Sequence, residues 1–338
     1  PLPAAITTTS TGNAAMPIFP GTATSPRFEP RVATSDPRFD LGRIIARALL
    51  LGALALLLGA CSAARLAYNQ APTATYWWLD GHVDFTSDQS APARADIERF
   101  FAWHRSAELP IYAQRLAQWQ TLAQQDISAE QACREVDAIR ASFSRMSERG
   151  VMPLTTLALQ LTPAQLAHMQ RYQTKGDEEF AKDFLRGSPA KRLDKRLDRA
   201  IDRYETLYNS LTEPQRQQLK TGLQQSAWDP QRTQAERQRR QAAMLQTIRE
   251  VQAAHGAAFA ATGARTPPPE AVTTLRIWSQ QLQNSPTPGY PAYSAALVKD
   301  GCIQFAALHN STSAEQRAHA VGVLKGYEGD MRALAAQD

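Results

Sequence analysis

Histidine, cysteine and acidic residues are the side chains through which this 338-residue chain could do chemistry, and their spacing does not favour catalysis. No HExxH or HxH pattern occurs, and no histidine lies beside a carboxylate cluster with ligand spacing, so no metal site is predicted. The chain also lacks a GxSxG nucleophile elbow and a glycine-rich phosphate loop. We therefore expect a protein that is not an enzyme and has no cofactor. The histidines are His82, His104, His168, His255, His309 and His319.

The charge balance does not favour a nucleic-acid partner. The net charge is +5, but residues 1–60 hold five arginines against Glu29, Asp36 and Asp40, which leaves +3 for the rest. Nucleic-acid binders concentrate lysine and arginine on one face, which so mild an excess does not indicate. With 43% hydrophobic and 20% charged residues the chain is in the globular range.

Residues 43–60 have the pattern of an export signal. Arg43 and Arg47 form a basic start, and an apolar run follows over 48–60. As a helix this run would be about 20 Å long, which is short of the roughly 30 Å hydrocarbon core of a bilayer. A signal peptide is therefore expected rather than a membrane span.

The signal ends in Leu58, Gly59, Ala60 and Cys61, an order similar to the lipobox of bacterial lipoproteins. We expect cleavage before Cys61 and attachment of acyl chains to it, which would hold the body on a membrane. In lipoproteins that resemble this chain, a residue other than aspartate after the cysteine usually permits transfer to the outer membrane. The resemblance and Ser62 therefore imply the outer membrane, facing the periplasm, over the inner membrane. The alternative is a buried core helix with a chance cysteine.

Residues 1–42 are rich in proline, threonine, serine and alanine, with no helical or strand period. We expect them to be disordered. If the start of translation has been assigned too far upstream, this would explain why these residues precede an export signal.

Cys133 and Cys302 remain after Cys61 is lipidated. Export would place them in an oxidising compartment where thiols tend to pair, so a disulfide is the favoured interpretation. The alternative is two buried, unpaired cysteines.

Apolar residues recur at three and four positions from residue 86 onward, and no long segment alternates at period two. The fold class is therefore expected to be all-α, a bundle of roughly nine to eleven helices. Five helix starts carry a capping box, in which serine or threonine precedes glutamine by three residues. The boxes pair Thr86 with Gln89, Ser128 with Gln131, Thr162 with Gln165, Thr212 with Gln215 and Ser313 with Gln316.

The mature chain is expected to divide into three parts. A lipidated tether covers 61–80 and includes an aromatic cluster at Tyr76, Trp77 and Trp78. The main helical domain covers 81–265. A helical C-terminal subdomain with proline-rich stretches covers 266–338. A disulfide from Cys302 would link it to the helix that carries Cys133.

The densest unit of unusual residues covers 103–112. His104 and Arg105 can pair with Glu108 at one helical turn, Pro110 would open the next helix, and Trp103 and Tyr112 would pack the corner. A structural corner is the favoured interpretation. A partner site built from Trp103, His104, Arg105, Glu108 and Tyr112 is the alternative.

This unit, with the lipobox, Tyr68-Asn69, the cluster at 76–80 and the helix start from Phe85 to Gln89, resembles a family of proteobacterial lipoproteins called domain of unknown function 6279. The resemblance covers residue 61 to roughly residue 223. It implies a location and a fold only, because that family brings no activity, cofactor or catalytic residue.

The favoured function is a non-catalytic envelope lipoprotein that binds or scaffolds an envelope protein or polymer. A chaperone-like role is the alternative, because Leu161 to Gln165 and Leu211 to Gln215 are similar to the LTxxQ helix starts of small periplasmic chaperones. An envelope hydrolase is a remote third, since the sequence offers no nucleophile and no metal site.

Overall fold

The computed structural model describes residues 63–264 and 266–337, which belong to one compact unit, Ala60–Asp338. All regular elements in these ranges are helices and none is a strand, so the all-α prediction is confirmed. Ten helices result when those that continue through a π-helical segment (η) are counted once, which agrees with the predicted number. The segments expected to be disordered (1–42) or a signal peptide (43–60) lie outside the described residues.

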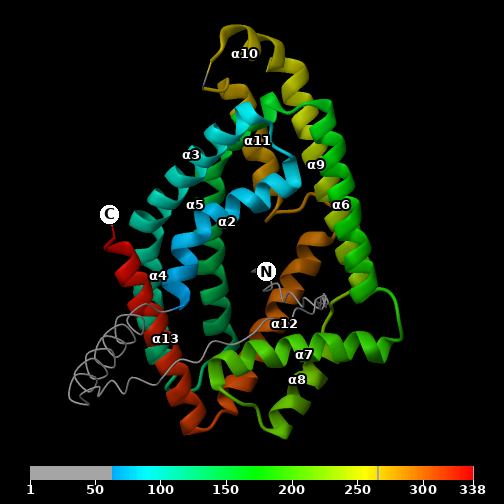
Figure 1. Cartoon of the computed structure of the whole chain (residues 1–338). Helices are drawn as coiled ribbons and strands as arrows, with labels where there is room; N and C mark the ends of the chain where they lie inside the picture. The colour runs from blue at the N-terminus through cyan, green and yellow to red at the C-terminus, as the bar shows by residue number, and fades with distance from the viewer. Residues whose placement is uncertain (1–62, 265, 338) are drawn as a thin grey trace, which may run out of the picture. The chain divides into compact units, whose positions relative to one another are not determined.

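The elements of Figure 1 are α2 (Ala63–Val83), α3 (Ser87–Trp103), η1 (His104–Glu108), α4 (Leu109–Leu122), α5 (Ala129–Gln160), α6 (Pro163–Phe184), α7 (Pro189–Tyr208), α8 (Glu213–Gln225), α9 (Pro230–Val251), η2 (Gln252–Gly256), α10 (Ala257–Thr262), α11 (Pro269–Gln281), α12 (Tyr290–Asn310) and α13 (Ala314–Ala335).

The helices begin where the sequence provides caps. All five predicted capping boxes are present, at the starts of α3, α5, α6, α8 and α13. At α5, the Ser128 hydroxyl accepts from the Gln131 amide at 3.2 Å, and the Gln131 side chain accepts from the Ser128 amide at 2.7 Å. Each box satisfies backbone donors that a helix start otherwise leaves unpaired.

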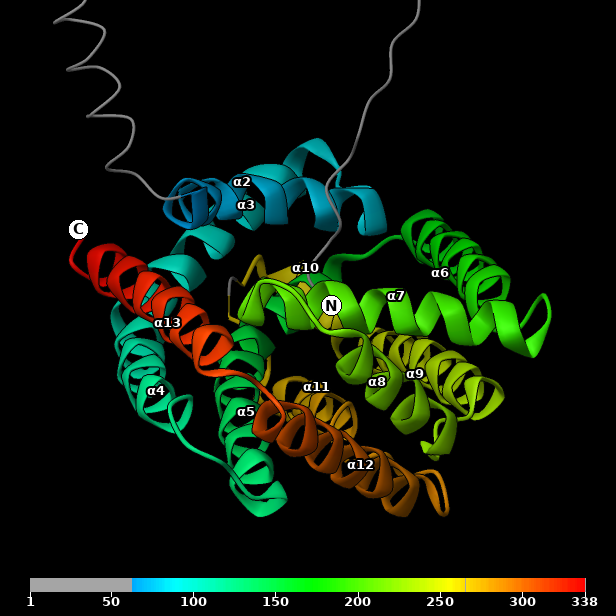
Figure 2. The same cartoon turned by 90° about the horizontal axis from the view of Figure 1, so that it is seen from below.

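Helix α5 is the central element, with α3, α9, α11 and α12 packed against it. Figures 1 and 2 show α13 beside α4, although the two helices are far apart in sequence. All three helices that follow residue 266 thus pack on earlier parts of the chain: α11 and α12 on α5, and α13 on α4.

Three apolar clusters hold these helices together. The largest joins α5, α6, α9 and α11, with Leu159, Leu245 and Leu275 among its buried members. The second joins α4, α7, α8, α12 and α13 around Tyr208 and Leu308, and the third joins α5 to α12 around the two cysteines. Burial of a leucine stabilises a fold by about 1.5–3 kcal/mol, so these clusters dominate the stability.

Within 63–264 and 266–337, none of the helices combines the length and the apolar character needed to cross a bilayer.

Candidate functional site

The residues expected to carry the membrane anchor, Leu58, Gly59, Ala60 and Cys61, lie outside the described residues. Helix α2 starts at Ala63, two residues after Cys61. Near its start, Arg65 forms an ion pair with Asp330 of α13 at 3.1 Å. The beginning of the described chain is therefore fixed against the C-terminal helix.

The aromatic cluster of α2 divides between core and surface. Tyr76 is buried, and the Arg94 guanidinium lies 3.4 Å from its ring centre. Trp77 and Trp78 are 60% and 56% exposed. Two exposed tryptophans on the helix that follows Cys61 are compatible with a position at a membrane interface, where such rings are enriched.

The predicted corner at 103–112 is instead a π-helical segment, η1, inside one continuous helix from α3 to α4. The Leu109 amide donates to the His104 carbonyl, five residues back. Pro110 has no amide hydrogen, and in an α-helix its ring would collide with the carbonyl four residues earlier. A widened turn relieves this conflict without ending the helix, so Pro110 does not open a new one.

Four of the residues quoted for the family resemblance meet at this segment. The Tyr68 hydroxyl and His104 Nδ1 lie 2.9 Å apart and share a hydrogen bond. Arg105 donates to Asn69 Oδ1 at 3.5 Å, and its guanidinium lies 5.7 Å from the Tyr68 ring centre. Burial lowers the pKa of His104, against a smaller opposite effect of Glu108. The cluster therefore attaches α2 to the π segment through polar contacts.

Glu108 does not pair with Arg105 as its spacing suggested. Its carboxylate is buried and accepts two hydrogen bonds from Arg145 of α5, at 2.6 and 2.8 Å. The wider π turn changes which side chains share a helix face, and the arginine fork offers the carboxylate two donors at once. These bonds with Arg145 lower the pKa of Glu108.

Tyr112 and Trp103 complete the group. Burial, followed by the charge of Glu108, raises the pKa of Tyr112 to about 12, so its hydroxyl stays protonated. Trp103 packs on Phe100 with ring centres 5.7 Å apart, and Arg149 lies 5.8 Å from the Trp103 ring centre. All five residues of the predicted partner site thus lie on one stretch of helix, where His104, Arg105 and Glu108 each contact a charged or polar partner.

The described residues contain no group of three or more histidine, cysteine or acidic side chains that could hold a metal ion.

A second candidate site, which the sequence did not predict, is an apolar pocket of about 570 Å³. Its walls come from α4, α5, α7, α12 and α13. The sequence pattern shows apolar stripes on each of these helices but cannot show that the stripes leave space between them. The wall includes the apolar side chains Leu116, Trp119, Val136, Leu207, Val298 and Phe305.

Several polar side chains in the pocket wall are already hydrogen-bonded. Glu135 accepts from Arg115 and from the Trp119 indole, both at 2.7 Å. His309 shares one hydrogen bond with the Tyr208 hydroxyl at 2.8 Å and another with the Gln125 carbonyl at 2.8 Å. Burial lowers the pKa of His309, which keeps this part of the wall uncharged at neutral pH.

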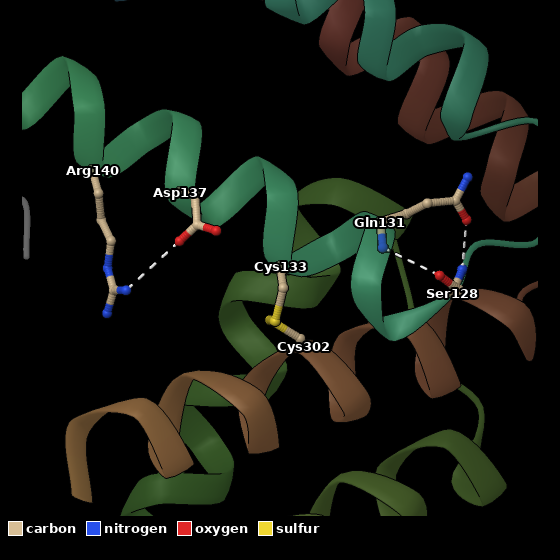
Figure 3. Close-up of a disulfide and its surroundings, with 6 residues drawn as sticks. All are labelled: Ser128, Gln131, Cys133, Asp137, Arg140 and Cys302. Atoms are coloured by element: carbon tan, nitrogen blue, oxygen red, sulfur yellow. Dashed lines mark hydrogen bonds and ion pairs between the residues drawn. A yellow bond between two sulfur atoms is a disulfide. The ribbon is translucent and has the colours of Figure 1, made fainter. Parts of the chain in front are cut away.

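The predicted disulfide between Cys133 and Cys302 is confirmed, with Cα atoms 5.4 Å apart. Figure 3 shows it joining α5 to α12, close to the capping box of Ser128 and Gln131. Cys302 also lines the pocket, so the disulfide holds two of its walls at a fixed separation.

A family model, described as a family of unknown function (DUF6279), matches residues 81–261, more than half of the chain. The chain belongs to this family. The resemblance inferred from the sequence is thereby confirmed at the level of the family. Neither the search of curated proteins nor the search of solved structures found a match.

The DUF6279 match covers some features of the two sites and leaves others outside. It includes η1, Arg145 and Cys133, and so the whole pair between Glu108 and Arg145. Tyr68, Cys302 and the pocket walls formed by α12 and α13 lie beyond it. The pocket is therefore completed by a part of the chain that the family model does not describe.

Proposed function

We propose that this DUF6279 protein is a non-catalytic binding protein of the cell envelope, held on the outer membrane by acyl chains on Cys61. The single observation that supports a binding role is the apolar pocket. Ligand sites typically enclose about 300–1,000 Å³ with mostly apolar walls, and this pocket has both properties. Its polar wall groups bind one another, which suits retention of a ligand more than reaction with it.

Two further features are compatible with the anchor. Trp77 and Trp78 are exposed on α2, the first helix after Cys61, and interfacial tryptophans stabilise proteins at membranes. The ion pair of Arg65 with Asp330 fixes the start of that helix, so that a lipid at Cys61 would hold the helical body close to the membrane.

The anchor is tested by fractionating cell envelopes and measuring the mass of the N-terminal peptide. We expect a peptide that begins at Cys61 and carries acyl chains, recovered with the outer membrane. Cys61→Ala is the control and should leave an uncleaved, unacylated chain. An unacylated peptide from the wild-type chain would contradict the proposal.

The binding role is separated from a chaperone-like role by a second experiment. Crosslinking in the envelope followed by affinity capture should recover one defined envelope component if the chain is a dedicated binding or scaffold protein. Suppression of aggregation for several unrelated unfolded proteins, without a defined component, would favour the chaperone-like alternative. The LTxxQ segments at Thr162 and Thr212 form capping boxes within the fold, so the chaperone-like role has less support from the geometry.

A further inference from the structure

The apolar pocket has the properties of a site for one aliphatic chain. The surface that its wall presents is mostly carbon, and the polar groups of Trp119, Glu135, Tyr208 and His309 are hydrogen-bonded within the protein. A ligand with polar groups along its length would lose hydrogen bonds to water without replacing them. A saturated chain loses none and gains burial for each methylene group.

The mouth of the pocket is bordered by exposed residues. Ile139 of α5 is 53% exposed, and Tyr327 of α13 is 41% exposed. A molecule with an apolar chain and a polar end can therefore place the chain among the walls and leave the polar end in water. Isolated exposed apolar residues are ordinary, but these two border a preformed apolar space.

The position of the pocket relative to the anchor indicates where such a molecule would come from. Tyr327 lies one helical turn before Asp330, and Asp330 is the ion-pair partner of Arg65. Arg65 is four residues after Cys61. Lipids of the membrane that holds Cys61 would then be the apolar molecules at the highest local concentration around the mouth.

We propose that the pocket between α4, α5, α7, α12 and α13 binds the single acyl chain of a free membrane lipid, such as a fatty acid or a lysophospholipid. This deepens the binding role proposed above and rests on it. The acyl chain lies along Phe305 and Val136, and the disulfide between Cys133 and Cys302 ties α5 to α12 in the pocket wall.

The test uses the chain from residue 61 to 338 with Cys61→Ser, exported with a cleavable signal so that the disulfide forms. This part contains all three apolar clusters and the compact unit. Palmitate binding is measured by titration calorimetry and by native mass spectrometry. We expect one palmitate per chain and at least tenfold weaker binding of octanoate, because octanoate buries fewer methylene groups.

A filled-pocket variant distinguishes the site from general surface adsorption. Gly301 borders the pocket on α12, and a Cβ atom added there meets nothing within 4 Å. Gly301→Phe should therefore fold, place a ring at the mouth and weaken palmitate binding at least tenfold. Gly322→Phe is the matched control, because Gly322 also lies in a helix with open space around its Cβ position but does not line the pocket. It should bind palmitate as the Cys61→Ser chain does.

Several outcomes would overturn the proposal. No palmitate binding, or equal binding by Gly301→Phe, removes the site. A lipidated wild-type protein that binds no palmitate, although the Cys61→Ser chain does, identifies the anchor's own acyl chain as the occupant. Tighter binding of an apolar peptide than of palmitate assigns the pocket to a protein partner. Acylation of Cys61 is measured separately, so failure of the anchor and failure of the acyl-chain site remain distinguishable.

Discussion

Gln89 and Gln165 exchange side-chain hydrogen bonds across the starts of two helices. Each amide nitrogen donates to the other residue's amide oxygen, at 3.4 and 2.6 Å. Each nitrogen also donates to a backbone carbonyl before the other helix: Gln89 to Gln160 at 3.1 Å and Gln165 to Asp84 at 2.9 Å. The glutamines of two capping boxes therefore also join α3 to α6.

The same arrangement occurs a second time. Gln215 and Gln316 exchange hydrogen bonds at 2.9 and 3.0 Å, and each donates to the carbonyl two residues before the other helix's cap, at Ser311 and Ser210. The glutamines of four of the five boxes thus form two hydrogen-bonded pairs. Pairing between helix starts explains these four boxes, three of which begin with threonine and one with Ser313, by a structural role within the fold.

We predict that Gln165→Ala destabilises the fold more than Gln131→Ala does. Gln165 is buried and bonds to its own box, to Gln89 and to Asp84, whereas Gln131 caps α5 without a partner glutamine. The expected losses in the free energy of unfolding are about 2–3 kcal/mol and about 1 kcal/mol, respectively. Urea unfolding of both variants measures the difference. Equal losses would show that the pairing adds no stability.

The disulfide between Cys133 and Cys302 should stabilise the fold by limiting the conformations that are open to the unfolded chain. It closes a loop with a sequence separation of 169 residues, for which the chain-entropy model gives about 5 kcal/mol and typical native disulfides give about 2–5 kcal/mol. A double variant with serine at both positions should melt at a lower temperature than the wild type. Added reductant should lower the wild-type melting temperature and leave the double variant unchanged. An equal effect on both would mean that the cysteines are unpaired in solution.

Arg145 should contribute far more stability than Arg140, although both belong to α5. Arg145 neutralises Glu108, whose side chain is 1% exposed, while Arg140 reaches exposed Asp137 only at 3.7 Å. Arg145→Ala leaves a buried carboxylate unpaired and should cost about 3–5 kcal/mol. Arg140→Ala should change the free energy of unfolding by less than about 0.5 kcal/mol. Restoration of stability by adding Glu108→Gln to Arg145→Ala would confirm that the unpaired charge causes the loss.

Features encoded locally in the sequence were predictable. A capping box depends on two residues three positions apart, and helical periodicity is visible within one segment. The disulfide was also predictable, because only two cysteines remain once Cys61 is assigned to a lipid. These features determine the class of the fold and the helix starts at Thr86, Ser128 and Thr162.

The candidate sites depend on distant contacts that no local pattern contains. Spacing suggested Arg105 as the partner of Glu108, but Arg145 of another helix donates both hydrogen bonds to this carboxylate. Pro110 predicted the start of a new helix. Instead the helix continues through a π turn, which tolerates the lack of an amide hydrogen on proline. The pocket is space that remains where five helices pack together. The apolar stripe that contains Phe305 predicts a buried helix face, but it does not predict this space.

Glu236 of α9 should make stability depend on pH in the acid range. Burial alone would raise the pKa of this carboxyl, but hydrogen bonds from Arg239, Arg240 and Thr287 outweigh it and lower the pKa to about 2. The folded-state pKa lies below the ordinary value of 4.5. Its contribution is therefore complete above about pH 4.5 and is lost as the pH falls toward 2.

Glu236→Gln should consequently lower the free energy of unfolding at neutral pH by up to about 3 kcal/mol. It should also reduce the steepness with which stability falls between pH 4.5 and 2. Urea unfolding at a series of pH values measures both effects. Glu250→Gln, at an exposed position of the same helix, is the control and should change neutral-pH stability by no more than about 0.5 kcal/mol. If Glu236→Gln retained the wild-type acid dependence, other carboxylates would have to account for it, because a glutamine side chain cannot bind the proton.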